Sequence, residues 1–102
     1  MLIFISSPFA GNIPKNIGLA RKYCRYAVDK GHTPVAPHLL YPQFLEEKTE
    51  RNLGLQMGLQ LLIFCDELWA FGDPSEGMKI EIDYAKRKNT CYVYPKHYII
   101  FL

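Results

Sequence analysis

The sequence predicts an α/β domain in which helices cover both faces of a parallel β-sheet. Short continuous apolar runs, typical of buried strands, alternate along the chain with longer segments of helical spacing. The length of 102 residues is enough for one compact domain and no more. Because a helix lies between successive strands, we expect the strands to run parallel rather than to form hairpins.

The first predicted strand is the apolar run LIFIS at residues 2–6, which leads into a segment rich in turn formers. A helix follows, with Pro14 in its first turn and Asn12 as the candidate cap. Its helical spacing continues to Gly31, a residue type that commonly ends helices. Residues 33–37, TPVAP, are then predicted to form a short second strand.

Residues 37–50 show no single period, and we interpret them as a functional loop that leads into a helix over about residues 50–64. The third predicted strand is DELWAFG at residues 66–72, and the loop DPSEG follows it. Residues 75–88 form the next predicted helix, and TCYVY at residues 90–94 forms the fourth strand.

The tail KHYIIFL, residues 96–102, is too apolar for a loose end. Two interpretations of it stay open: a fifth strand, or an arm buried against another subunit of a homo-oligomer. With right-handed crossovers, the order of elements predicts a flavodoxin-like or Rossmann-like doubly wound parallel sheet of four to five strands with helices on both faces. We expect residues 1–102 to form one domain.

Charge and cysteine usage argue against several classes of function. The formal charge of +2 is small and Lys and Arg form no run, which argues against binding to nucleic-acid polymers. Cys24, Cys65 and Cys91 form neither a CxxC pair nor a zinc spacing, so we predict buried thiols in a reducing cytosol and neither a metal nor another cofactor. The first residues show neither a signal peptide nor a membrane span, which favours a cytoplasmic protein without a membrane partner.

Ligands of such sheets bind beyond the carboxyl ends of the strands, so we predict that the loops after the first three strands form the site. The polar groups expected to meet there are Ser6, Ser7, Gly11, Asn12, His38, Gln43, Asp73 and Ser75. Three aromatic residues are placed to stack on a planar ring, namely Phe9, Tyr41 and Phe44. These residue types suit a nucleoside-like small molecule, although the aromatic residues and His38 have packing as an alternative role.

The predicted helix over residues 75–88 carries a carboxylate at the edge of its apolar side. At about 100° per residue, Met78, Ile82 and Ala85 centre the apolar face, and Glu81 lies on its flank. Burying an unpaired carboxylate costs several kcal/mol, so such a group normally has a partner or a function. Two roles stay open: Glu81 pairs with a nearby Lys or Tyr and fixes the helix, or it takes part in chemistry.

Three segments, at residues 3–11 (IFISSPFAG), 65–72 (CDELWAFG) and 75–85 (SEGMKIEIDYA), resemble the nucleoside 2-deoxyribosyltransferase superfamily. PHLLYPQFLEE at 37–47 and LGLQMGLQLLIFCDELW at 53–69 extend the resemblance to the small bacterial and phage branch, the DUF4406-like proteins. The resemblance covers nearly the whole chain. It implies a flavodoxin-like fold and cleavage of the N-glycosidic bond of a nucleoside or nucleotide.

In the enzymes of that family a glutamate four residues after a glycine is the nucleophile, and Gly77 and Glu81 match this pair. The resemblance thus implies that Glu81 attacks the anomeric carbon to form a glycosyl-enzyme intermediate, with Asp73 as the candidate acid. Sugar or phosphate would be contacted by Ser6, Ser7, Gly11, Asn12, Ser75 and Gly77. The enzymes commonly hold the nucleophile with a tyrosine, and Phe4 occupies the matching position here.

Three functions stay open on the sequence alone. The first is the N-glycosidase or deoxyribosyltransferase described above. The second is a non-catalytic binder of a nucleotide or ADP-ribose-like ligand, of phage or bacterial origin, which is favoured by Phe4 in place of tyrosine. The third is an assembly protein whose aromatic tail mediates contacts between subunits.

Overall fold

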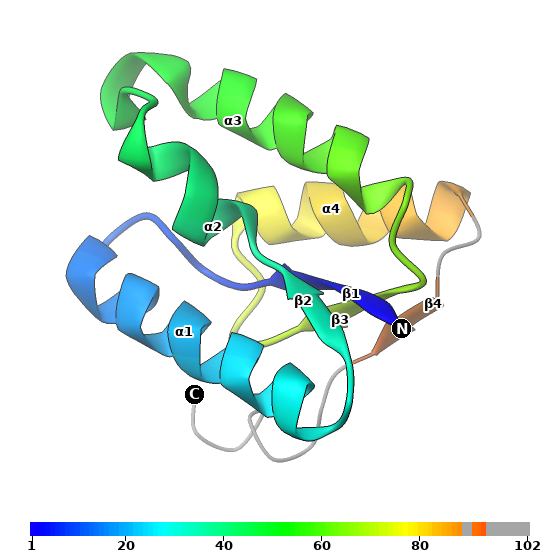
Figure 1. Cartoon of the computed structure of the whole chain (residues 1–102). Helices are drawn as coiled ribbons and strands as arrows, with labels where there is room; N and C mark the ends of the chain where they lie inside the picture. The colour runs from blue at the N-terminus through cyan, green and yellow to red at the C-terminus, as the bar shows by residue number, and fades with distance from the viewer. Residues whose placement is uncertain (89–90, 94–102) are drawn as a thin grey trace.

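The structure is a computed structural model that describes residues 1–88 and 91–93. In chain order the elements are β1 (Leu2–Ser6), α1 (Ile13–Asp29), β2 (Thr33–Val35), α2 (Pro37–Leu40), the 3₁₀ helix Tyr41–Gln43, α3 (Glu47–Leu62), β3 (Glu67–Ala70), α4 (Glu76–Arg87) and β4 (Cys91–Val93). Figure 1 shows the sheet in the middle, with α1 on one side of it and with α3 and α4 on the other.

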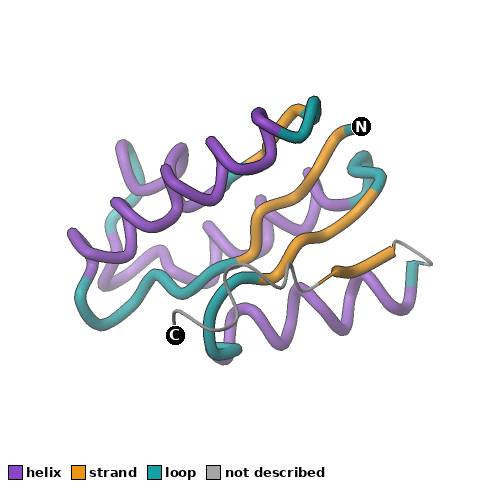
Figure 2. Tube along the Cα trace, turned by 90° about the horizontal axis from the view of Figure 1, so that it is seen from below, coloured by secondary structure: helices purple, strands orange, loops and turns teal. Residues whose placement is uncertain are grey.

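All strand pairs are parallel, and the strand order is β2-β1-β3-β4. β1 is central: it pairs with β2 as far as Phe4 and with β3 as far as Ser6, which lies opposite Ala70. Figure 2 shows the strands side by side between the helices. Because β1 and β3 end at the same edge of the sheet, the loops that follow them leave the sheet close together.

The predicted fold class, a flavodoxin-like or Rossmann-like doubly wound sheet of four to five strands, is wrong. The structure is a small α/β domain built on a three-stranded parallel sheet, β2-β1-β3, with four α-helices among the described residues. β4 adds only a three-residue pairing at the outer edge of β3. β2 is also shorter than predicted because TPVAP does not stay extended: the strand ends at Val35, and Pro37 begins α2.

Residues 37–50, predicted to be a loop, are mostly helical. Pro37 and Pro42 stand in the first turns of α2 and of the 3₁₀ helix, where the missing N–H of proline costs no hydrogen bond. α3 then begins at Glu47, three residues before the predicted start, and it is kinked at Glu50, whose φ is −121° and ψ 19°. These short helices bring the side chains of residues 37–50 over the end of the sheet.

The core has two parts, one on each face of the sheet. On the face covered by α1, the ring of Tyr23 stacks on that of Phe71, with ring centroids 4.2 Å apart. On the other face, α3 and α4 enclose Phe4, which is fully buried. α3 approaches α2 closely at Gly58, where an added Cβ would lie 3.4 Å from Pro37 Cγ. The sheet is therefore covered on both faces, as the alternation of strands and helices predicts.

Parts of the prediction concern residues that the structure does not describe. The tail, residues 96–102, and the side chain of Cys91 lie outside the described residues, so the predictions made for them stay predictions. Cys24 and Cys65 are free thiols, the first half-buried and the second buried. Among the described residues, we find no helix with the length and apolar character needed to cross a membrane.

Candidate functional site

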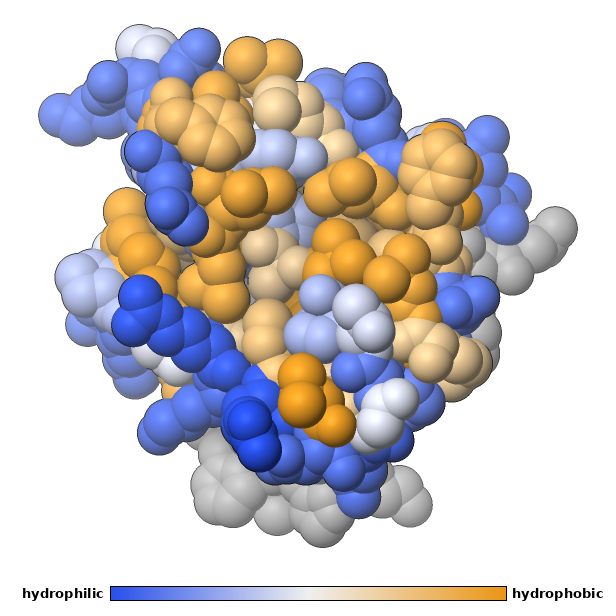
Figure 3. Space-filling model, in the orientation of Figure 1, coloured by the Kyte–Doolittle hydropathy of each residue, from blue (hydrophilic) through white to orange (hydrophobic). Residues whose placement is uncertain are grey.

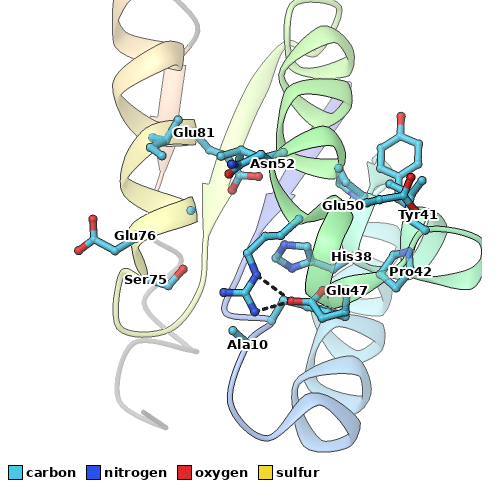
Figure 4. Close-up of a pocket in the computed structure, with 18 of the residues that line it drawn as sticks. Ala10, His38, Tyr41, Pro42, Glu47, Glu50, Asn52, Ser75, Glu76 and Glu81 are labelled. Atoms are coloured by element: carbon cyan, nitrogen blue, oxygen red, sulfur yellow. Dashed lines mark hydrogen bonds and ion pairs between the residues drawn. The ribbon is translucent and has the colours of Figure 1, made fainter.

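A cavity of about 400 Å³ opens at the carboxyl end of the sheet. Its walls come from the loop after β1, from α2 and the 3₁₀ helix, from the first half of α3 and from the N-terminal half of α4. Figure 4 shows labelled residues of α4 on one side of this space and labelled residues of α2, the 3₁₀ helix and α3 on the other, with the side chain of Glu76 directed away from it. This is the edge at which parallel α/β sheets bind their ligands.

Glu81 lies in the wall of this cavity and is only 4% exposed. Its position is set by the start of α4. The loop after β3 turns at Gly72, whose φ of 92° is in the left-handed region that favours glycine. Ser75 then caps the helix by accepting a hydrogen bond from the Met78 N–H at 3.3 Å. Glu81 follows one turn later, on the side of α4 that faces the sheet.

The described partner of the Glu81 carboxylate is a serine at the end of β1. Ser6 Oγ donates a hydrogen bond to Glu81 Oε1 at 2.6 Å, and both residues are buried. None of the ion pairs found among the described residues includes Glu81. Of the two roles left open by the sequence, the pairing of Glu81 with a nearby Lys or Tyr is therefore not observed among the described residues.

Burial raises the pKa of Glu81 from its ordinary value of 4.5 to about 7, and the hydrogen bond from Ser6 opposes part of this rise. Near neutral pH the group is thus present both as a carboxylate and as a carboxylic acid. Carboxyl groups with pKa values moved toward the working pH are typical of groups that attack substrates or transfer protons. The combination of a cavity, burial and a single hydrogen bond makes Glu81 the strongest candidate for chemistry in the described residues.

His38 forms part of the opposite wall. Its Nδ1 is buried and has no hydrogen-bond partner among the described residues, and its ring centroid lies 5.1 Å from that of Phe9. Burial lowers the pKa of His38 to about 4, against an opposing effect of the nearby Glu47 carboxylate. The imidazole is therefore neutral at pH 7. A buried ring nitrogen without a partner is suited to hydrogen-bond a ligand.

The first turns of α3 add a group of charged residues that the sequence did not assign to the site. Arg51 donates from Nε to Glu47 Oε1 at 2.8 Å and forms an ion pair with the same carboxylate through Nη2. Glu50 Oε1 accepts a hydrogen bond from the Glu46 N–H at 2.8 Å. The signal in the sequence was the run EEKTERN, which begins at Glu46 directly after an irregular aromatic segment.

The structure brings most of the predicted site residues together. Those that line the cavity are Phe9, His38, Tyr41, Ser75, Gly77 and Glu81. Ser6 contacts Glu81 from the end of β1. These residues come from three separate segments of the chain, so their meeting depends on the parallel arrangement of β1 and β3.

The other predicted site residues lie outside the lining. Asn12 caps α1 by accepting a hydrogen bond from the Lys15 N–H at 3.2 Å, and Gly11 is an exposed turn residue with a φ of 96°. Ser7 is buried, and its Oγ has no partner among the described residues. Phe44 is 62% exposed beside Tyr41. Asp73, the candidate acid, is exposed in the loop before α4.

Comparison with known proteins gives a family without a stated activity. A search of the curated proteins finds no match. A family model described as Domain of unknown function (DUF7768) matches residues 1–95. The resemblance to the nucleoside 2-deoxyribosyltransferase superfamily stays a prediction. Since the matched segment includes every element of the fold and every residue of the cavity, the chain belongs to the DUF7768 family.

Proposed function

We propose that this protein cleaves the N-glycosidic bond of a nucleoside or nucleotide, with Glu81 as the nucleophile. The observation that carries the proposal is the Glu81 carboxyl group itself. It lies buried in the wall of a cavity of about 400 Å³, is held by one hydrogen bond from Ser6, and has its pKa raised to about 7. A structural carboxylate in such a place would be expected to have a cationic partner.

In the proposed reaction a carboxylate oxygen of Glu81 attacks the anomeric carbon of the sugar. The bond from that carbon to the base breaks, and its electron pair leaves on the base nitrogen, which takes a proton from water or from an acid. A water molecule or a second base then attacks the anomeric carbon and gives up its proton. The ester bond to Glu81 breaks in this step, and its electron pair returns to the carboxylate.

Ser6 supports this role in place of the tyrosine that the resemblance implied at position 4. Phe4 carries no hydroxyl, and its ring is fully buried in the core between β1 and the helices α3 and α4. Two residues further along β1, on the same face of the strand, the Ser6 hydroxyl orients Glu81 Oε1 at 2.6 Å. The loss of the tyrosine hydroxyl is thus matched by a serine that performs the same positioning.

A non-catalytic binder of a nucleotide or ADP-ribose-like ligand is the second candidate, and the position of Asp73 favours it. Asp73 is exposed and does not line the cavity, so the acid expected to protonate the leaving base is not beside Glu81. A binder retains the cavity, the aromatic residues and the buried carboxylate but releases no base. Turnover therefore distinguishes the two candidates.

The test incubates the protein with the deoxynucleosides, their 5′-monophosphates and NAD, and measures free base by chromatography. We expect base from at least one substrate, a loss of at least about 10³-fold in Glu81→Gln because the nucleophile is gone, and a smaller loss in Ser6→Ala. Asp83→Asn is the matched control, since Asp83 is an exposed acid on the same helix, paired with Arg87 at 3.3 Å. Undiminished release from folded Glu81→Gln, or no release by the native protein, contradicts the proposal.

A further inference from the structure

The described charged residues in the cavity wall are predominantly acidic. Five carboxylates and one guanidinium line it, namely Glu46, Glu47, Glu50, Glu76, Glu81 and Arg51, although the Glu76 side chain is 91% exposed and forms an ion pair with Lys79 at 3.5 Å. The cavity therefore has a net negative charge even when Glu81 is protonated. The small positive charge of the whole chain does not indicate this, because most of the basic residues lie elsewhere.

The one described cation of the lining is already neutralised. Both Nε and Nη2 of Arg51 are directed at a single oxygen of Glu47, one turn earlier on α3, as the dashed lines in Figure 4 show. Phosphate sites normally offer an unpaired Arg or Lys, whose planar or point charge matches the phosphate oxygens. Here a phosphate would have to compete with Glu47 for the guanidinium while facing the Glu50 carboxylate.

The N-terminus of α4 does not reverse this balance. A helix start attracts anions through its free N–H groups and its dipole, which amounts to about half an elementary charge. In α4 the Met78 N–H is already bonded to Ser75 Oγ, and the first turn contains the carboxylate of Glu76. Because Glu76 is itself paired with Lys79, the partial positive charge is opposed mainly by the carboxylates of Glu46 and Glu50 in the cavity wall.

We infer that the ligand of this cavity is an uncharged nucleoside and not a nucleotide. The inference rests on the proposed function and specifies its substrate class. The cavity offers such a ligand the aromatic rings of Phe9 and Tyr41 and the unpartnered His38 Nδ1 for the base. The buried Glu81 is available to the anomeric carbon. A phosphate on the same sugar would meet like charges across the cavity, and charges near a protein surface repel more strongly than in bulk water because the effective dielectric constant is lower.

The experiment compares each deoxynucleoside with its own 5′-monophosphate, so that base and sugar are matched within each pair. Base release gives kcat/KM for both members, and the shift in melting temperature at equal concentration gives binding without turnover. We expect the nucleoside to be preferred by at least about tenfold in low salt. The preference should shrink in 0.5 M salt because salt screens the repulsion of the phosphate.

Glu47→Gln provides the matched variant, because it releases Arg51 from its ion pair and removes one negative charge. We expect the ratio of kcat/KM for the monophosphate to kcat/KM for the nucleoside to rise by about tenfold in this variant. The double variant Glu47→Gln with Arg51→Gln should return most of the way to the native ratio. A rise that persists in the double variant would show that Arg51 does not contact the phosphate and would contradict the charge argument.

The outcomes separate this inference from the proposed function. Faster cleavage of the monophosphate than of its nucleoside overturns the inference and leaves the proposed function standing. Stronger binding of the monophosphate without release of base overturns both. Preferential binding of the nucleoside without release of base supports the inference and overturns the proposed function. If neither member of any pair binds or is cleaved by folded native protein, both are overturned. The native comparison needs no substitution, so it stands even where a variant fails to fold.

Discussion

At the scale of single residues, the site depends on the contact between Glu81 and Ser6, which lie 75 positions apart in the sequence. Burial removes the carboxylate from water, and one hydroxyl replaces only part of the lost solvation. The result is a carboxyl group whose charged form is disfavoured in the folded protein. A group of this kind costs stability whenever it is ionised, which is acceptable where the ionised form has a function.

Compared with native protein, Glu81→Gln should therefore gain more stability at high pH than at low pH. Burial raises the pKa of Glu81 from 4.5 in the unfolded chain to about 7 in the folded protein. The folded state holds this proton more tightly, so stability is lost as pH rises through that window, by up to about 3 kcal/mol. Glutamine does not titrate. Denaturant titrations at pH 4 and pH 8 give the free energy of unfolding of both proteins. The difference between variant and native protein should be more in favour of the variant at pH 8 than at pH 4.

Asp83→Asn is the control for this measurement, because Asp83 is exposed on the same helix. It should follow the native pH dependence. If Glu81→Gln and native protein differ by the same free energy at both pH values, Glu81 does not titrate as its burial implies.

At the scale of elements, the sequence predicted best those segments whose own residues determine them. α4 was predicted over residues 75–88 and spans Glu76–Arg87, because the Ser75 cap and the apolar spacing are local signals. The short helices before α3 were not predicted, because residues 37–50 show no single period and were interpreted as a loop. In the structure, Pro37 begins α2, and Pro42 stands in the first turn of the 3₁₀ helix.

The site shows the same distinction between features that local residues determine and features that depend on the rest of the fold. The placement of Glu81 on the edge of an apolar face was visible in the sequence, as was the edge of the sheet where ligands bind. The contribution of Glu47, Glu50 and Arg51 was not, because charges at a helix start usually face solvent. Only the folding of α2 and the 3₁₀ helix over the end of the sheet brings these residues into the cavity wall.

Substitution of the α4 cap tests how the element supports the site. Ser75→Ala removes the acceptor for the Met78 N–H and should lower the free energy of unfolding by about 1 kcal/mol. Ser75→Asp also caps helices and should restore most of the loss, with denaturant unfolding as the measurement. Equal stability of Ser75→Ala and native protein would show that the cap does not hold the start of α4.

At the scale of the whole molecule, a small sheet limits how much apolar surface the chain can bury by itself. The central sheet has three strands, two clusters of core residues lie on its faces, and several large apolar side chains remain on the outside. Figure 3 shows apolar side chains gathered on one face of the molecule among hydrophilic ones. Exposed apolar groups of this kind are common at contacts between subunits.

The expected homo-oligomer can be tested at the most exposed of these groups. Phe64, just after α3, is 76% exposed, and Ile63 beside it is also exposed. If this end of α3 is a subunit contact, Phe64→Ser should lower the molar mass measured by light scattering at concentrations where the native protein is an oligomer. The reason is that the few residues that dominate a contact lie near its centre, are enriched in aromatic side chains, and each contribute about 2 kcal/mol or more to association. Val28→Ser, at an exposed apolar position on α1, is the control and should leave the mass unchanged. A native protein that is monomeric across the concentration range would rule out the homo-oligomer, and an oligomer unaffected by Phe64→Ser would place its contact on another surface.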